Sequence, residues 1–88
     1  MANAMSDEQI QAHIEKLEAE ERSLRRDESE AASDSERVAA DADRLEEVRI
    51  CLDRLWDYLR QRRALRDAGR NPDEAELRDA RTVERYLG

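Results

Sequence analysis

Apolar residues recur at intervals of seven between residues 10 and 59 of this chain. The column contains, in order, Ile10, Leu17, Leu24, Ala31, Val38, Leu45, Leu52 and Leu59. Such a repeat places the residues on one face of an α-helix and is typical of helices that pair in coiled coils. The chain also has only two glycines, one proline and no phenylalanine, which leaves little material for strands and β-turns. The sequence therefore predicts an all-α fold.

The repeat leaves two arrangements open, one long helix in a parallel coiled coil or an antiparallel hairpin of two helices. The positions three residues further along would complete the core of a parallel pair, and four successive ones are acidic: Glu20, Asp27, Asp34 and Asp41. Carboxylates facing each other in such a core would repel. The Ser/Asp cluster over 33–35 also weakens any helix that runs through it. We therefore predict a coiled-coil-like antiparallel hairpin, with helices over about 7–31 and 35–68.

Short motifs predict where these helices begin and end. Ser6 and Gln9 have the spacing of a capping box, in which each side chain bonds the other residue's backbone N–H. Ser33 and Glu36 have the same spacing and predict the start of the second helix. Gly69 follows that helix and suits the left-handed conformation that often ends one.

A short helical tail is expected after the hairpin. Asn71 can cap a helix and Pro72 suits its first position, so we predict a short helix through about Asp79. The final residues, 81–88, either form one more turn that docks an apolar face or fray. The predicted organisation is a disordered start or expression remnant over 1–5, a hairpin over 6–70, and a tail over 71–88.

Charge is distributed unevenly along the chain. The formal net charge is −7, with 16 acids and 8 bases in residues 1–54 but 7 acids and 8 bases in residues 55–88. An acidic chain repels phosphate backbones and anionic lipids, so we expect neither nucleic acid nor a membrane as a partner. Cys51 is the only cysteine and cannot form an intramolecular disulfide. With no apolar run of membrane-spanning length and no signal peptide, we expect a cytoplasmic protein.

The second helix has a wider apolar face than the first can cover. Leu45, Val48, Leu52, Leu55, Trp56 and Leu59 share an arc of about 100°. In a hairpin that turns near residue 33, Ile10 would face Trp56. We expect Trp56 as a core anchor, and the alternative is an interface hot spot, since tryptophan is enriched at interfaces. Asp7 and Glu8 would then pair with Arg62 or Arg63. The uncovered width predicts either that the tail folds back or that a second copy packs there, and we expect a homodimer with four helices.

The second half of the chain resembles a known family. The shared features are Trp56-Asp57, Leu59-Arg60-Gln61-Arg62-Arg63, Ala68-Gly69, Pro72-Asp73-Glu74-Ala75, and Val83-Glu84 with Tyr86. They resemble the small actinobacterial proteins grouped as domain of unknown function 2630, and the segment 18–25 is similar to the family's first helix. The resemblance implies a small bacterial helical protein and no known activity, ligand or cofactor.

The pattern of functional side chains favours association over catalysis. His13 and Cys51 cannot complete a metal site, since a structural zinc needs four ligands; we expect His13 at the edge of the core and Cys51 as a small apolar filler. No nucleophile or phosphate-binding motif is present, so no enzyme, cofactor or small-molecule ligand is expected. The leading hypothesis is self-association or contact with an unidentified protein, and the alternative is an RNA- or ribosome-associated factor that uses the Arg-rich end of the second helix. The candidate interaction surface comprises Trp56, Tyr58, Arg60, Arg62, Arg63, Leu65, Arg66 and Tyr86.

Overall fold

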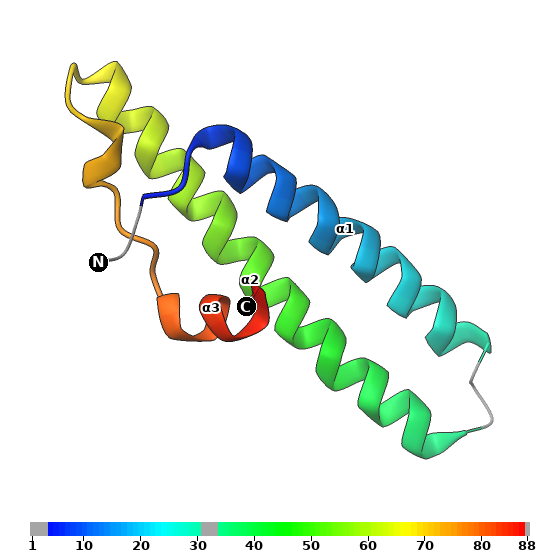
Figure 1. The fold of residues 1–88 in the computed structure, drawn as a ribbon. Helices are drawn as coiled ribbons and strands as arrows, with labels where there is room; N and C mark the ends of the chain where they lie inside the picture. The colour runs from blue at the N-terminus through cyan, green and yellow to red at the C-terminus, as the bar shows by residue number, and fades with distance from the viewer. Residues whose placement is uncertain (1–3, 31–33, 88) are drawn as a thin grey trace.

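Two long antiparallel helices form the body of the protein in a computed structural model, which describes residues 4–30 and 34–87 (Figure 1). The elements in chain order are α1 (Asp7–Glu30), α2 (Ser35–Asp67), the 3₁₀-helix η1 (Pro72–Glu74) and α3 (Ala80–Leu87). After α2 the chain turns back and α3 packs against the middle of α2 (Figure 1). The molecule measures 54 × 22 × 15 Å. The predicted hairpin with a short helical tail is therefore confirmed, and a continuous helical rod is ruled out.

The helix ends follow the local motifs closely. At the start of α1, the backbone N–H of Ser6 donates to Gln9 Oε1 (2.9 Å) and that of Gln9 donates to Ser6 Oγ (3.2 Å), as the capping box predicts. At the start of α2, the carboxylate of Asp34 accepts from the N–H of Arg37 at 3.2 Å. The predicted cap Ser33 lies outside the described residues, and Asp34, one residue later, is the residue that caps α2.

A Schellman motif ends α2 at the predicted glycine. Gly69 has a φ of +72°, in the left-handed region. Its N–H donates to the carbonyl of Arg66 (3.0 Å), and the N–H of Arg70 donates to the carbonyl of Leu65 (2.8 Å). Two carbonyls of the last helical turn are thereby satisfied, and the chain is free to reverse direction.

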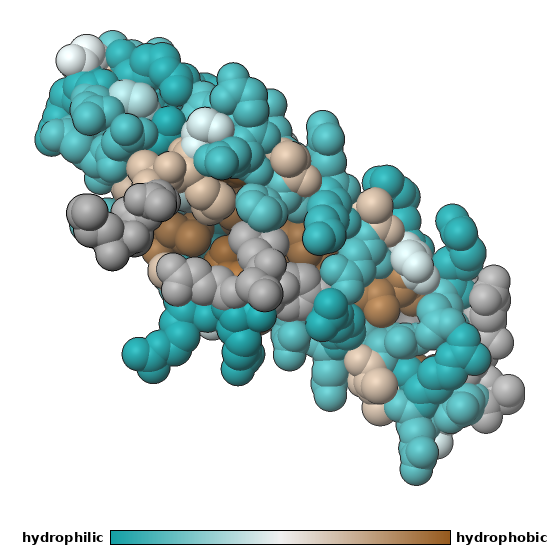
Figure 2. All heavy atoms as spheres, viewed as in Figure 1, coloured by the Kyte–Doolittle hydropathy of each residue, from teal (hydrophilic) through white to brown (hydrophobic). Residues whose placement is uncertain are grey.

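The hydrophobic core lies where α1, α2 and α3 overlap. Its buried members are Ile10, Ile14 and Leu17 from α1; Val48, Cys51, Leu52, Leu55, Tyr58 and Leu59 from α2; and Val83 from α3. Beyond α3, toward the end of α1 and the start of α2, Leu24, Val38 and Leu45 are only half-buried. Figure 2 shows apolar atoms emerging in the seam between α1 and α2 in this part of the molecule. Cys51 is fully buried and His13 half-buried, as predicted.

The tail differs from its prediction. Asn71 caps a helix and Pro72 begins it, but this helix is a single 3₁₀ turn that ends at Glu74 and not near Asp79. The reason lies on α2, where the side-chain amide of Gln61 pairs with both backbone groups of Glu76 (2.9 and 3.2 Å). Because this backbone already has partners, it does not continue the helix, and a turn at Arg78 and Asp79 then leads into α3 at Ala80.

The prediction that Trp56 is an anchor of the core within one chain is wrong, and its placement on an interaction surface stays a prediction. Its side chain is 42% exposed, whereas the neighbouring Leu55 is fully buried. The cause is the tail, which packs on α2 and buries the side of that helix that carries Cys51, Leu55 and Tyr58. Since successive helical residues point 100° apart, Trp56 is left at the edge of this face.

Candidate functional site

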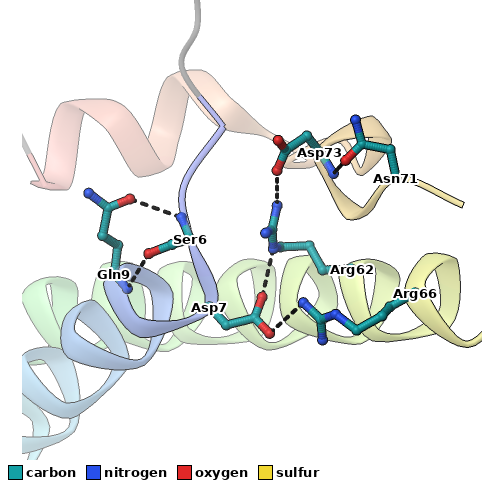
Figure 3. A network of polar contacts seen from close by, with 7 residues as sticks. All are labelled: Ser6, Asp7, Gln9, Arg62, Arg66, Asn71 and Asp73. Atoms are coloured by element: carbon teal, nitrogen blue, oxygen red, sulfur yellow. Dashed lines mark hydrogen bonds and ion pairs between the residues drawn. The ribbon is translucent and has the colours of Figure 1, made fainter.

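A network of charged side chains joins three elements at one end of the molecule (Figure 3). Arg62 of α2 is buried, with a side chain only 6% exposed. Its Nε lies 2.7 Å from Asp7 Oδ1 at the start of α1, and its Nη1 lies 2.9 Å from Asp73 Oδ1 in η1. The other oxygen of Asp7, Oδ2, lies 2.9 Å from Nη2 of Arg66. Arg62 thus links the beginning of α1 to the tail through the end of α2.

Backbone capping holds both carboxylates of this network in place. Asp7 lies within the Ser6–Gln9 capping box, directly after Ser6, and Asp73 donates its N–H to Asn71 Oδ1 at 3.0 Å (Figure 3). The pairing of Asp7 with Arg62 was predicted and is confirmed; the second partner of Asp7 is Arg66 and not Arg63. The participation of Asp73 was not predicted, because it depends on how the tail folds back. Arg62 is occupied on two sides by carboxylates, so this cluster works as an internal clamp.

The clamp makes the stability of the fold depend on pH. The hydrogen bond from Arg62 lowers the pKa of Asp7 below its ordinary range; burial opposes this shift, and Arg66 adds to it. A lowered pKa in the folded state stabilises the protein above the unfolded pKa of about 3.9, and this contribution is lost as pH falls through the folded value.

We predict that Asp7→Asn lowers the free energy of unfolding by about 1–2 kcal/mol at pH 7, because charge-assisted hydrogen bonds are replaced by neutral ones. The difference from wild type should shrink as the pH is lowered below about 4, where wild-type Asp7 itself becomes protonated. Urea unfolding at pH 7, 4 and 3 measures this difference. An equal difference at all three values would show that the Asp7 carboxylate contributes nothing through its charge.

The predicted interaction surface is divided by the fold. Tyr58 and Arg62 are buried within the chain, so they are corrected from surface to interior positions. Leu65 is half-buried, and Arg66 is exposed but paired with Asp7. Tyr86 belongs to α3, and its side chain lies outside those that the structure describes. The other exposed members are Trp56, Arg60 and Arg63.

These exposed residues belong to a longer stripe on α2, which we call the Trp56 face. At 100° per residue, its members fall within an arc of about 60°. All of them are exposed or half-buried, and they are Val38, Ala42, Leu45, Arg49, Trp56, Arg60, Arg63 and Asp67. Sequence reasoning assigned Val38 and Leu45 to the core and did not single out Arg49. The signal was present, because these positions follow one another at steps of four, three or seven.

A small hollow of about 180 Å³ lies between α2 and α3. It is lined by Arg44, Glu47, Thr82 and Arg85. Arg44 pairs with Glu20 of α1, with its Nη2 2.8 Å from the carboxylate, and the hydroxyl of Thr82 lies 3.0 Å from Asp79 Oδ1. Glu47 adds a negative charge to the lining. Because Arg44 is paired with Glu20 and Glu47 shares the lining with Arg85, the hollow carries little net charge. Among residues 4–30 and 34–87, no helix has the length and apolarity needed to cross a bilayer.

Comparison with known proteins places the chain in a family. The family described as protein of unknown function (DUF2630) matches residues 6–88, which is nearly the whole chain. The chain belongs to the DUF2630 family. The resemblance seen in the second half of the sequence is thereby confirmed, and residues 6–88 include both the clamp and the Trp56 face.

Curated relatives of this DUF2630 protein occur in mycobacteria. Uncharacterized protein Rv0898c of Mycobacterium tuberculosis and uncharacterized protein Mb0922c of Mycobacterium bovis are each 54% identical to it over 44 residues. The matched segment is 50% of this chain and 51% of each relative, so the chain spans about half the length of the curated relatives it matches. No solved structure matches the chain significantly.

Proposed function

We propose that this DUF2630 protein acts by association and not by catalysis, and that the Trp56 face is the surface through which it binds a second copy of itself. The observation that supports the proposal most directly is the exposure of Trp56, the only tryptophan in the chain, at 42%. Tryptophan and arginine are both enriched among the residues that dominate protein interfaces. Trp56 lies between Arg49 and Arg63, each one heptad away on the same face.

The shape of the hairpin supports the same proposal. Val38 and Leu45 lie beyond the part of α2 that α3 covers, and each is only half-buried. A second helical layer on α2 would bury both of them together with Trp56. Such a layer would supply apolar contact that a thin hairpin cannot provide alone.

RNA binding by the Arg-rich end of α2 has less support. Arg62 and Arg66 are bound to Asp7, and Nη2 of Arg70 lies 3.1 Å from Glu74 Oε2. These pairs neutralise much of the basic segment within the chain. Arg60 and Arg63 remain exposed, and two cations on an acidic protein make a weak phosphate-binding surface.

The proposal predicts that the protein is dimeric and that Trp56→Ala dissociates it. Light scattering at micromolar concentrations should give twice the chain mass of 10.3 kDa for wild type. Because truncating a central interface tryptophan commonly costs 2 kcal/mol or more, the dissociation constant of Trp56→Ala should rise by about 30-fold or more. Trp56 fluorescence gives a second readout, since its emission should shift to the blue as the wild-type concentration rises.

Ile50→Ala is the matched control. Ile50 is a half-buried apolar residue of the same helix, and it points about 120° away from Trp56. This variant should keep the wild-type dissociation constant. A monomeric wild type at 100 µM would contradict self-association, and a Trp56→Ala dimer of unchanged affinity would contradict the Trp56 face as its surface.

A further inference from the structure

We infer that the second copy packs antiparallel on α2, with Trp56 of each copy against Leu45 of the other. This inference rests on the proposed self-association and adds its direction and register. In this arrangement the two copies are related by a twofold axis near residues 50 and 51, and the four long helices form one bundle.

The distribution of charge along α2 favours the antiparallel direction. Within about 80° of Trp56, residues 35–48 carry Asp41 and Glu46, and residues 54–67 carry Arg60 and Arg63 with Asp67 at their end. Arg62 and Arg66 are paired with Asp7 inside the chain and do not add to this charge. Beside the Trp56 face, the first segment is therefore net acidic and the second is net basic. Antiparallel pairing places the acidic segment of each copy beside the basic segment of the other, whereas parallel pairing places like charges together.

The apolar residues of the Trp56 face suit the same direction. Trp56 is large and exposed at one end of this apolar series, and Leu45 is half-buried eleven residues earlier. A parallel pair would place Trp56 on Trp56 and would leave Leu45 to meet only Leu45. In the antiparallel pair each tryptophan covers a leucine, so both large side chains of both copies are buried in two equivalent contacts.

The register follows from these contacts and agrees with the polar residues around them. When Trp56 lies on Leu45, Arg63 comes opposite Val38 of the other copy. Val38 lies between Asp34 and Asp41 along that chain. Near the twofold axis, Arg49 comes beside Asp53 of the other copy. Arg49 and Arg63 of the Trp56 face therefore each have a carboxylate of the second copy within reach, which is the self-complementarity that a twofold interface requires.

Spin labels at two positions on α2 test the direction. Glu46 and Ala64 are both exposed, and both point about 80° to the same side of Trp56, so a label at either position borders the interface. A Cys51→Ala background removes the only native cysteine, and Glu46→Cys or Ala64→Cys is then labelled in the full chain. With an axis between residues 50 and 51, the paired labels are separated along the helix by about 14 Å at 46 and about 40 Å at 64.

Pulsed electron resonance should therefore show a short distance for the label at 46 and a long distance for the label at 64. Equal, short distances at both positions, from a protein that light scattering shows to be dimeric, would overturn the antiparallel inference and leave the proposed function standing. A dimer with the long distance at 46 would overturn it as well. A monomer would contradict the proposed function itself. Adding Trp56→Ala to each labelled variant should remove the distance signal, and its persistence would place the contact elsewhere.

Discussion

Leu55→Ala should lower the free energy of unfolding by about 3–4 kcal/mol, within the range for leucine truncations that leave a cavity. Leu55 is fully buried on α2, beside the core residues that α1 and α3 contribute. The cost has two parts, the lost burial of the removed carbon atoms and the cavity that remains between packed helices. For a domain of this size, each kcal/mol lowers the melting temperature by about 4–8 °C, so thermal unfolding followed by circular dichroism should show a large shift.

Leu65→Ala provides the matched control for this truncation. Leu65 belongs to the same helix but is only half-buried, so the same change should cost about 1 kcal/mol or less. Leu55→Met keeps most of the side-chain volume and should cost less than about 1.5 kcal/mol, which preserves a measurable protein if the alanine variant does not fold. Equal costs for Leu55→Ala and Leu65→Ala would contradict the assignment of Leu55 to the centre of the core.

The sequence predicted the fold where local signals and the apolar repeat agreed. The Ser6–Gln9 box and Gly69 determine helix ends through groups only three or four residues apart, so their effects can be read without a structure. The hairpin itself followed from the acidic column at Asp27, Asp34 and Asp41, because those side chains cannot occupy the core of a parallel pair. The tail was predicted less well, since its backbone at Glu76 is held by Gln61, fifteen residues earlier in the chain.

The sites were predicted less completely for a related reason. The pairing of Asp7 with Arg62 follows from antiparallel register, but Asp73 joins them only because the tail returns across the end of α2. Trp56 was assigned to the core on the assumption that α1 alone covers α2. Once α3 also packs on α2, the buried arc rotates, and a residue at its edge becomes exposed. A helical repeat shows which residues share a face, but it does not show how many neighbours will cover that face.

Arg62→Met should lower the free energy of unfolding by about 2–3 kcal/mol, because it removes the cation that joins two carboxylates while a side chain of similar length remains. Arg62 is buried, whereas the side chains of Asp7 and Asp73 are 28% and 58% exposed. Solvent can therefore stabilise the two carboxylates in part, which keeps the cost below that of breaking a fully buried pair. Arg63→Met is the matched control, since Arg63 is the adjacent residue and is exposed. This change should alter stability by no more than about 0.5 kcal/mol.

A double-mutant cycle separates the charge of the clamp from its packing. If Arg62 stabilises the fold by pairing with Asp7, then Asp7→Asn should cost less in the Arg62→Met background than in wild type, because the carboxylate has already lost its main partner. The coupling free energy between Arg62 and Asp7 should be about 1 kcal/mol or more. Added salt should weaken this buried contact only slightly, and it should weaken the exposed contact between Arg66 and Asp7 more. If Arg62 instead stabilises the protein through the apolar stem of its side chain, the coupling should be near zero and Arg62→Met, which keeps such a stem, should be nearly as stable as wild type. That pair of results would contradict the clamp.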